Sequence, residues 1–246
     1  MSTETILPPA ANAVDTRDSG RLNARSGVAI PPLENGAHLS GSEFLRRYDA
    51  MPEVKKAELV QGTVYMSSPV RARAHARPDH MMQGWLWNYE AATPCAEAYS
   101  NSTVRFGADD VPQPDIVLCI LPNFGGKAHI NAHDFIVGSP ELVVEIAASS
   151  ASYDMNEKRD TYRRFGVREL LVWLTDENQI VWLQLEDDQY RPLPVDADGN
   201  IKSRVFPGLW LNAVAMLAYD KSGVMSALDR GLASAEHTAF RSLKSI

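Results

Sequence analysis

Three acidic residues interrupt strand-like segments that are otherwise apolar. Glu58 lies in AELV, Asp115 in PDIVL and Glu145 in VVEIA. An ionised carboxylate in a buried strand is costly unless a cation compensates its charge. Carboxylates that converge also disfavour one another's ionisation unless they share a proton or a divalent cation. Hard oxygen ligands suit Mg²⁺ or Mn²⁺, and such an ion activates water and stabilises phosphoryl displacement.

A structural interpretation of each acid stays open beside the chemical one. Single acids at strand ends often pair with Arg or Lys in ordinary ion pairs. For any one of the three acids, such an ion pair explains the residue about as well as a chemical role does. The position of Lys158 in the segment that follows Glu145 favours chemistry for the set as a whole.

Two other groups of residues are weaker candidates. His129 and His133 lie four positions apart, but no catalytic acid stands between them and their Gly-rich flank favours a loop. Ser149, Ser150 and Ser152 lack the Gly-x-Ser-x-Gly elbow of a nucleophile, so we expect them to cap a helix.

A basic segment, residues 68–78, is predicted to form a loop. It carries Arg71, Arg73, His75 and Arg77. These side chains could line a groove for a DNA backbone. A solvated surface loop is the favoured interpretation, because runs of charge usually are solvated.

The segment from Pro140 to Leu174 is expected to position Glu145 and Lys158. An apolar run, Leu142–Ala147, precedes a helix for which Asp154 and Glu157 supply the N-terminal signal and Gly166 the stop. A second apolar run follows. Strand, helix and strand in this order predict a crossover unit on a mixed sheet.

The remaining elements are predicted from periodicity and turn residues. We expect a capped helix from Ser40 or Ser42 to Pro52, a hairpin around Gln61-Gly62, a helix over 79–92 with a core stripe, a buried strand opened by Pro114-Asp115, a long loop over 121–140, strands over 180–185 and 190–193, and a peripheral helix from about Ser222 that Gly231 weakens.

Composition indicates a globular protein. Of 246 residues, 45% are hydrophobic and 22% charged, and the net charge of −7 counts mildly against nonspecific DNA binding. Two cysteines without metal-ligand spacing, no apolar run of membrane length and no secretory signal predict a cytoplasmic protein that is not in a membrane. Residues 1–38 are expected to be a mobile tail, and 39–246 a single domain.

Several pieces of the chain together resemble a known family. ELVQGTVYM, QPDIVLCI, PELVVEIAASSASYD and the series Lys158, Tyr162 and Gly166 to Glu169 resemble the Uma-two family of putative restriction endonucleases, within the PD-(D/E)XK nuclease superfamily. The resemblance covers roughly residues 40–220. It implies a restriction-endonuclease-like α/β fold: a mixed central sheet flanked by helices, with an extra β-rich C-terminal portion.

The same resemblance implies a metal-dependent endonuclease that hydrolyses DNA phosphodiester bonds. Asp115 and Glu145 would hold Mg²⁺ or Mn²⁺ with the backbone carbonyl of Ile146, and Glu58 would be an accessory acid and metal ligand. DNA would be the partner, and many members of the superfamily act as homodimers.

One position departs from the superfamily pattern. The lysine expected two residues after Glu145 is Ala147. In the family this lysine is thought to have moved to the following helix, where Lys158 matches it. The alternative is a catalytically degenerate nuclease fold that serves as a nucleic-acid-binding or protein-interaction module.

Overall fold

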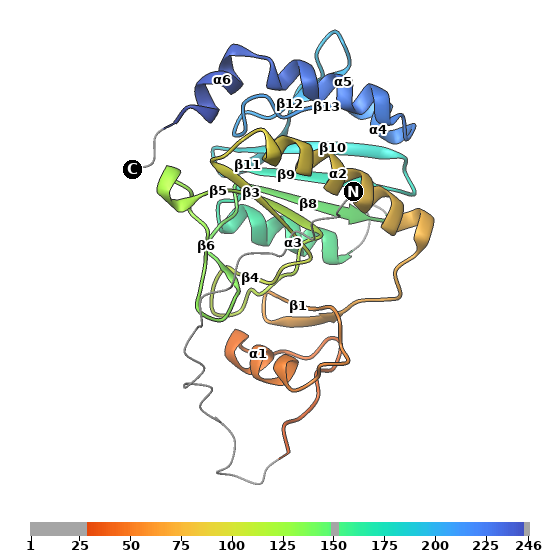
Figure 1. The fold of residues 1–246 in the computed structure, drawn as a ribbon. Coiled ribbons are helices and arrows are strands. Elements are labelled where there is room, and N and C mark those ends of the chain that lie inside the picture. The colour runs from red at the N-terminus through yellow and green to blue at the C-terminus, as the bar shows by residue number, and fades with distance from the viewer. Residues whose placement is uncertain (1–28, 149–152, 244–246) are drawn as a thin grey trace, which may run out of the picture. The chain divides into compact units, whose positions relative to one another are not determined.

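The computed structural model describes residues 29–148 and 153–243, and the side chains from residue 156 onward in the second range (Figure 1). The chain divides into two units, Met1–Pro31 and Pro32–Ile246. All the helices and strands described below belong to the second unit. The predicted roles of Ser149, Ser150, Ser152 and the Asp154 side chain lie outside the described residues.

A six-stranded mixed sheet forms the centre of the second unit, in the order β11-β10-β9-β8-β5-β3. Strands β8 and β9 are parallel and are joined through α3, which confirms the predicted crossover unit. The other neighbouring pairs in the sheet are antiparallel. The strands are β3 (Ala96–Ser100), β5 (Ile116–Ile120), β8 (Leu142–Ala147), β9 (Glu169–Leu174), β10 (Gln179–Glu186) and β11 (Gln189–Pro192), and α3 is Tyr153–Arg164.

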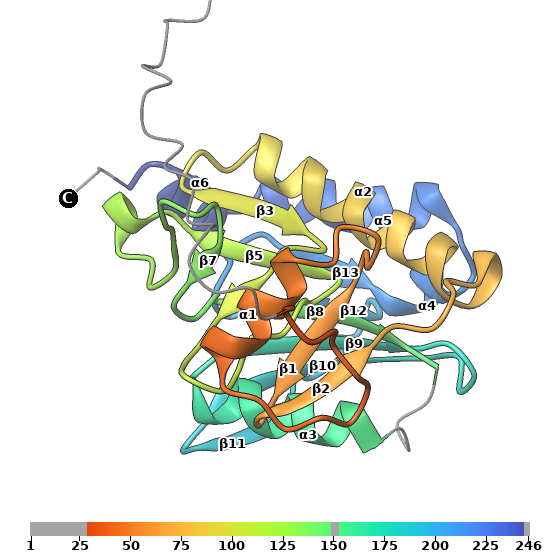
Figure 2. The ribbon, with the colours of Figure 1, turned by 90° about the horizontal axis from the view of Figure 1, so that it is seen from below.

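Helices cover both faces of this sheet. Figure 2 shows α2 (Arg77–Ala91) and α5 (Lys221–Leu232) on one side and α3 on the other. Because side chains alternate along a strand, Leu118 and Val144 pack in the α2 and α5 core, whereas Val117 and Val143 pack in the core that contains Tyr162 of α3. Odd-numbered positions of β5 and β8 therefore face α3.

Helix α2 carries the predicted core stripe, which is confirmed: Met82, Trp85, Leu86 and Tyr89 are buried. The predicted loop before it is wrong for residues 72–78. Residues Ala72–Ala76 form a π-helical turn, η1, that leads directly into α2. Alanine favours helix, and proline is well tolerated in the first turn of α2.

The predicted hairpin is confirmed as β1 (Ala57–Val60) and β2 (Thr63–Met66). Gln61 and Gly62 have φ angles of 51° and 77°, as a two-residue primed turn requires. The predicted short helix is α1 (Gly41–Asp49), capped by the Ser40 hydroxyl. Together α1 and the hairpin enclose a separate small core.

The predicted loop over 121–140 contains regular structure. Strands β6 (His129–Ile130) and β7 (Ile136–Val137) join β4 (Val104–Arg105) in a three-stranded sheet, after a 3₁₀ turn, η2 (Pro122–Phe124). Strands of two residues are too short to show an alternating pattern, so they could not be predicted from the sequence.

The chain continues after β11 with a short hairpin and three helices. The hairpin is β12 (Asn200–Lys202) and β13 (Trp210–Asn212), and the helices are α4 (Ala213–Leu217), α5 and α6 (Ala235–Arg241). Gly231 does more than weaken α5: a Cβ atom there would lie 2.1 Å from the carbonyl oxygen of Gly208, so the close contact requires glycine. No helix in the described ranges is long and apolar enough to span a membrane.

The segment just before α1 is packed on the hairpin, although the sequence assigns it to the tail. The Leu33 side chain is buried, and the backbone N–H groups of Gly36 and Leu39 donate to Val64 and Gly62. The tail boundary predicted at residue 38 therefore lies inside a docked segment, and the compact unit begins at Pro32.

We expect two nested deletions to separate tail from domain. Deleting residues 1–31 should leave the melting temperature nearly unchanged, since their composition offers little apolar surface to bury. Deleting residues 1–38 should lower it by several degrees, because burial of a leucine side chain alone contributes roughly 1.5–3 kcal/mol. Calorimetry of both truncations tests this; equal melting temperatures would show that residues 32–38 contribute nothing.

Candidate active site

Asp115 and Glu145 lie side by side on neighbouring strands. Ile116 of β5 pairs with Val144 of β8, so the antiparallel register places Asp115 opposite Glu145. Both carboxylates are buried, and Glu145 faces α3. The Ile146 N–H donates to Asp115 Oδ2 at 2.8 Å, which ties the start of β5 to β8.

Lys158 of α3 bridges Glu145 and the third acid, Glu58 of β1. Its Nζ lies 3.2 Å from Glu145 Oε1 and 2.8 Å from Glu58 Oε2. Tyr162, one helical turn later on the same face, donates its hydroxyl to Glu145 Oε1 at 2.5 Å. The Gln113 N–H donates to Glu58 Oε1 at 2.7 Å. The three acids predicted from sequence and Lys158 thus belong to one buried cluster.

Burial and neighbouring charges have opposing effects on the pKa values of Glu145 and Lys158. Burial raises the pKa of Glu145, and the charges of Asp115 and Glu58 raise it further, while Lys158 lowers it. Burial alone would lower the pKa of Lys158, but the charges of Glu145 and Glu58 outweigh it and hold that pKa above its usual value. Lys158 is therefore an ammonium ion that stabilises both carboxylates.

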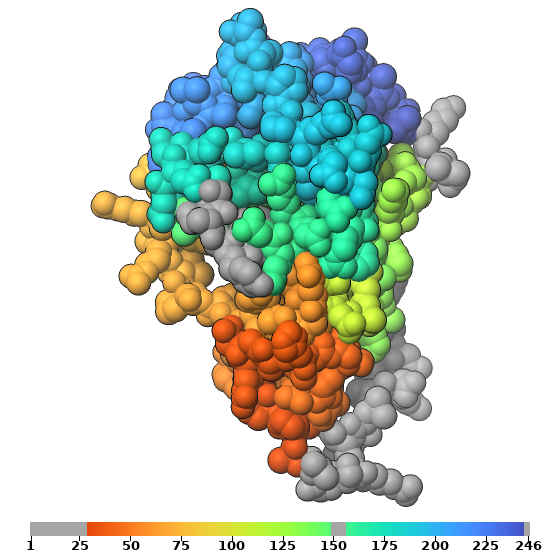
Figure 3. All heavy atoms as spheres, turned by 180° about the vertical axis from the view of Figure 1, so that it is seen from behind, coloured from red at the N-terminus to blue at the C-terminus, as the bar shows by residue number. Residues whose placement is uncertain are grey.

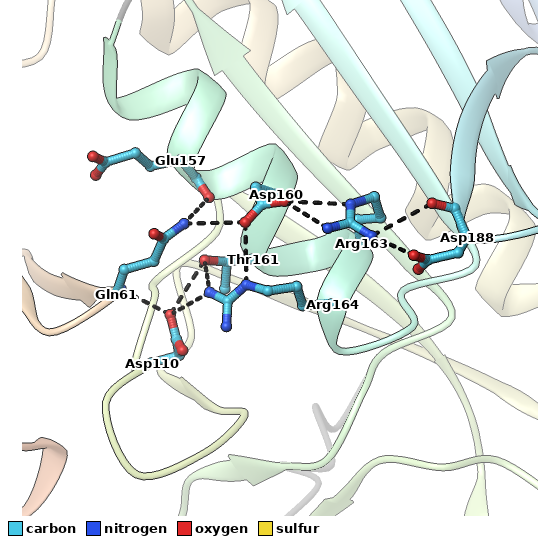
Figure 4. Close-up of polar contacts among 8 residues, drawn as sticks. All are labelled: Gln61, Asp110, Glu157, Asp160, Thr161, Arg163, Arg164 and Asp188. Atoms are coloured by element: carbon cyan, nitrogen blue, oxygen red, sulfur yellow. Dashed lines mark hydrogen bonds and ion pairs between the residues drawn. The ribbon is translucent and has the colours of Figure 1, made fainter.

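A polar network fixes α3 against the hairpin and the loop before β5 (Figure 4). The Gln61 side chain donates to the carbonyl of Glu157, and its backbone N–H donates to Asp110 Oδ1. The Thr161 hydroxyl donates to the same Asp110 oxygen. These contacts flank Lys158 on α3, so they set the position from which it reaches Glu58 on the hairpin.

Two further basic side chains contact Asp115, and neither was predicted as a site residue. Lys56 Nζ lies 2.8 Å from Asp115 Oδ1, and His75 Nε2 lies 3.3 Å from Oδ2. The period of two along a strand puts Lys56 on the same side of the chain as Glu58, which was an available signal. No sequence signal links His75 to Asp115, because η1 brings them together only in the folded protein.

These contacts change the acidity of both partners. Burial raises the pKa of Asp115, but the hydrogen bond from His75 and the charge of Lys56 outweigh it and bring that pKa well below its usual value. The hydrogen bond to Asp115 in turn raises the pKa of His75. Asp115 is therefore ionised across the physiological range.

We expect NMR titration to find the pKa of His75 above its ordinary value of 6.5, and Asp115→Asn to bring it back down. Because the folded-state pKa is the higher one, the contribution of His75 to stability is complete below the unfolded-state pKa. It is lost as the pH rises through the folded-state pKa. A His75 pKa that does not respond to Asp115→Asn would contradict the contact.

The carboxylates of this cluster suit a hard divalent cation, but their negative charges are already compensated by basic side chains. Asp115 and Glu145 offer carboxylate oxygens of the kind that Mg²⁺ prefers. Within the described residues, no three acid, His or Cys side chains are arranged to hold a metal, and His129 and His133 are exposed. Lys56, Lys158 and His75 oppose the three carboxylates instead. A metal would fit after a cation leaves Asp115.

Comparisons with known proteins identify the family of this chain and a solved structure with a similar fold. The family described as "Putative restriction endonuclease", Uma2, matches residues 42–214. A solved structure from Anabaena variabilis ATCC 29413, described as a putative nuclease belonging to DUF820, has a TM-score of 0.56 at 15% identity and covers 71% of this chain and 97% of its own. At that identity the likeness concerns the fold alone. No curated protein matches the chain.

The fold, a mixed sheet flanked by helices, is that of a nuclease-like α/β protein. The family match covers most of the chain, so the protein belongs to the Uma2 family of putative restriction endonucleases. The family predicted from sequence is thereby confirmed.

Proposed function

We propose that this protein is a metal-dependent endonuclease that hydrolyses DNA phosphodiester bonds. The observation that carries the proposal is the juxtaposition of Asp115 and Glu145 on paired strands, with the Lys158 ammonium beside Glu145. Acidic side chains are rarely buried, and ion pairs that serve stability alone can form at the surface without burying three acids in one place. The cost of burying them is explained if the acids serve chemistry.

Each residue has a proposed role. Asp115, Glu145 and the Ile146 carbonyl would hold Mg²⁺ or Mn²⁺, which when bound supplies an activated water and stabilises the charge of the phosphate. Lys158 orients the attacking water or stabilises that charge. Glu58 holds Lys158 through its 2.8 Å ion pair, and would reach the metal directly or through water.

Incubation of the protein with plasmid DNA tests the proposal. We expect nicked and linear products with Mg²⁺ or Mn²⁺ and none with EDTA. Duplex RNA and single-stranded DNA in parallel reactions define the substrate. Absence of cleavage under all these conditions would refute the proposal. Light scattering of the same sample tests whether the protein is a homodimer.

A second candidate is a degenerate nuclease fold that binds nucleic acid or protein without cleaving. The ion-paired state of all three carboxylates and Ala147 at the usual lysine position favour it. A metal titration separates the candidates, because a ligand that binds only the folded protein raises the melting temperature. No rise at millimolar Mg²⁺ or Mn²⁺ would favour the degenerate fold.

A further inference from the structure

The buried acid cluster has an outer edge, formed by Lys56 and His75. Their side chains are 21% and 30% exposed, whereas the side chains of Asp115 and Lys158 are 3% and 9% exposed. Each contacts a different oxygen of Asp115. A ligand that approaches Asp115 from solvent therefore meets the Lys56 and His75 side chains first.

The surface next to this edge is basic, although the whole chain is acidic. Arg71 and Arg73, beside His75 on the η1 segment, are exposed and form no ion pair with any residue that the structure describes. Arg77, in contrast, already has a partner, because its guanidinium lies 4.0 Å from the centre of the Tyr219 ring. In Figure 3 the amber segment that includes η1 projects from the edge of the domain. This arrangement favours an anionic ligand that extends beyond the acid cluster.

Lys56 differs from Lys158 in how easily it can change partner. Lys158 is held by two buried carboxylates, and loss of either contact would leave a buried charge unpaired. Lys56 makes a partly exposed ion pair with one carboxylate. Asp115 would keep its contact with His75 if Lys56 moved away, and the lysine stem is long and flexible. Exchange of Asp115 for another anion is therefore possible without unfolding the cluster.

We propose that Lys56, with His75 beside it, is a phosphate-binding residue that rests on Asp115 in the free protein and turns to a backbone phosphate of bound nucleic acid. This inference rests on the proposed function, since it takes a nucleic acid as the ligand. It also explains how Asp115 becomes available to bind a metal. When Lys56 moves to the phosphate, the Asp115 oxygen that it contacts becomes free.

The first test is metal-free binding of a short fluorescein-labelled DNA duplex, measured by anisotropy in EDTA over a series of salt concentrations. Loss of one phosphate contact makes the slope of log affinity against log salt shallower by about 0.9. We expect this change for Lys56→Gln and not for Lys56→Arg. The matched control is Lys127→Gln, an exposed lysine beyond the opposite end of β5, which should leave the slope unchanged.

The second test is a double-mutant cycle between Lys56 and Asp115. Asp115→Asn should tighten metal-free binding several-fold, because it frees Lys56 for the phosphate. In the Lys56→Gln background this gain should shrink. Glu145→Gln controls for the loss of one negative charge, since Glu145 contacts Lys158 and Tyr162 instead. Melting temperatures verify that each variant is folded.

The outcomes separate the inference from the function on which it rests. Wild-type slope in Lys56→Gln, or an equal gain from Asp115→Asn with and without Lys56, would overturn the inference while leaving the nuclease proposal intact. Failure of the wild-type protein to bind any nucleic acid would refute both. A shallower salt dependence in Lys56→Gln, together with a gain in affinity from Asp115→Asn that depends on Lys56, would support the movement of Lys56 from Asp115 to the phosphate.

Discussion

Asp115→Asn and Glu145→Gln are each expected to abolish cleavage, by orders of magnitude in rate, while the fold stays intact. Both substitutions keep the shape of the side chain and remove one anionic oxygen that would hold the metal. Asparagine can still accept the Ile146 N–H through its amide oxygen, and glutamine can still accept the Tyr162 hydroxyl. Plasmid cleavage with Mn²⁺ and calorimetry of each variant measure the two effects.

A matched control for this experiment is Glu53→Gln, which changes an exposed carboxylate in the turn before β1. It should cleave at the wild-type rate. If Asp115→Asn or Glu145→Gln also cleaves at that rate, the residue concerned does not belong to the metal site. If either variant is unfolded, its inactivity says nothing about catalysis, so the melting temperature is part of the result.

Lys158→Ala is expected to cost both activity and stability. The ammonium bridges Glu145 and Glu58, and its removal leaves two buried carboxylates without their cation. Breaking a buried ion pair in this way typically costs about 3–5 kcal/mol. We expect a lower melting temperature and a cleavage rate reduced by orders of magnitude. Metal affinity should change less than the rate, because lysine is not a metal ligand.

A rescue variant separates the chemical role of Lys158 from its structural one. Position 147 shares the sheet face of Glu145, where the superfamily pattern places its lysine. Ala147→Lys combined with Lys158→Ala should recover part of the cleavage rate. Lys158→Ala that cleaves like the wild type would show that Lys158 has no part in the reaction, and the degenerate nuclease fold would become the better hypothesis.

The sequence by itself determined the central elements and the identity of the family. Apolar runs predicted β8 and β9, an alternating pattern predicted the hairpin, and the helical stripe of Met82, Leu86 and Tyr89 predicted α2. These signals are local, because each depends on the neighbours of a residue along one strand or helix. The acids Glu58, Asp115 and Glu145 were visible for the same reason, as charges inside apolar runs.

Only the tertiary structure decided that Lys56 and His75 meet Asp115 and that Lys158 pairs with Glu58 as well as Glu145. Lys56 and His75 reach Asp115 from separate segments, and Lys158 contacts Glu58 because α3 lies against the hairpin. The short strands β6 and β7, the contact between Gly208 and Gly231, and the docking of Leu33 also depend on distant parts of the chain. Packing sets such contacts, and no local pattern encodes them. The sequence therefore indicated the three acids and Lys158, whereas the fold was needed to bring Lys56 and His75 to Asp115.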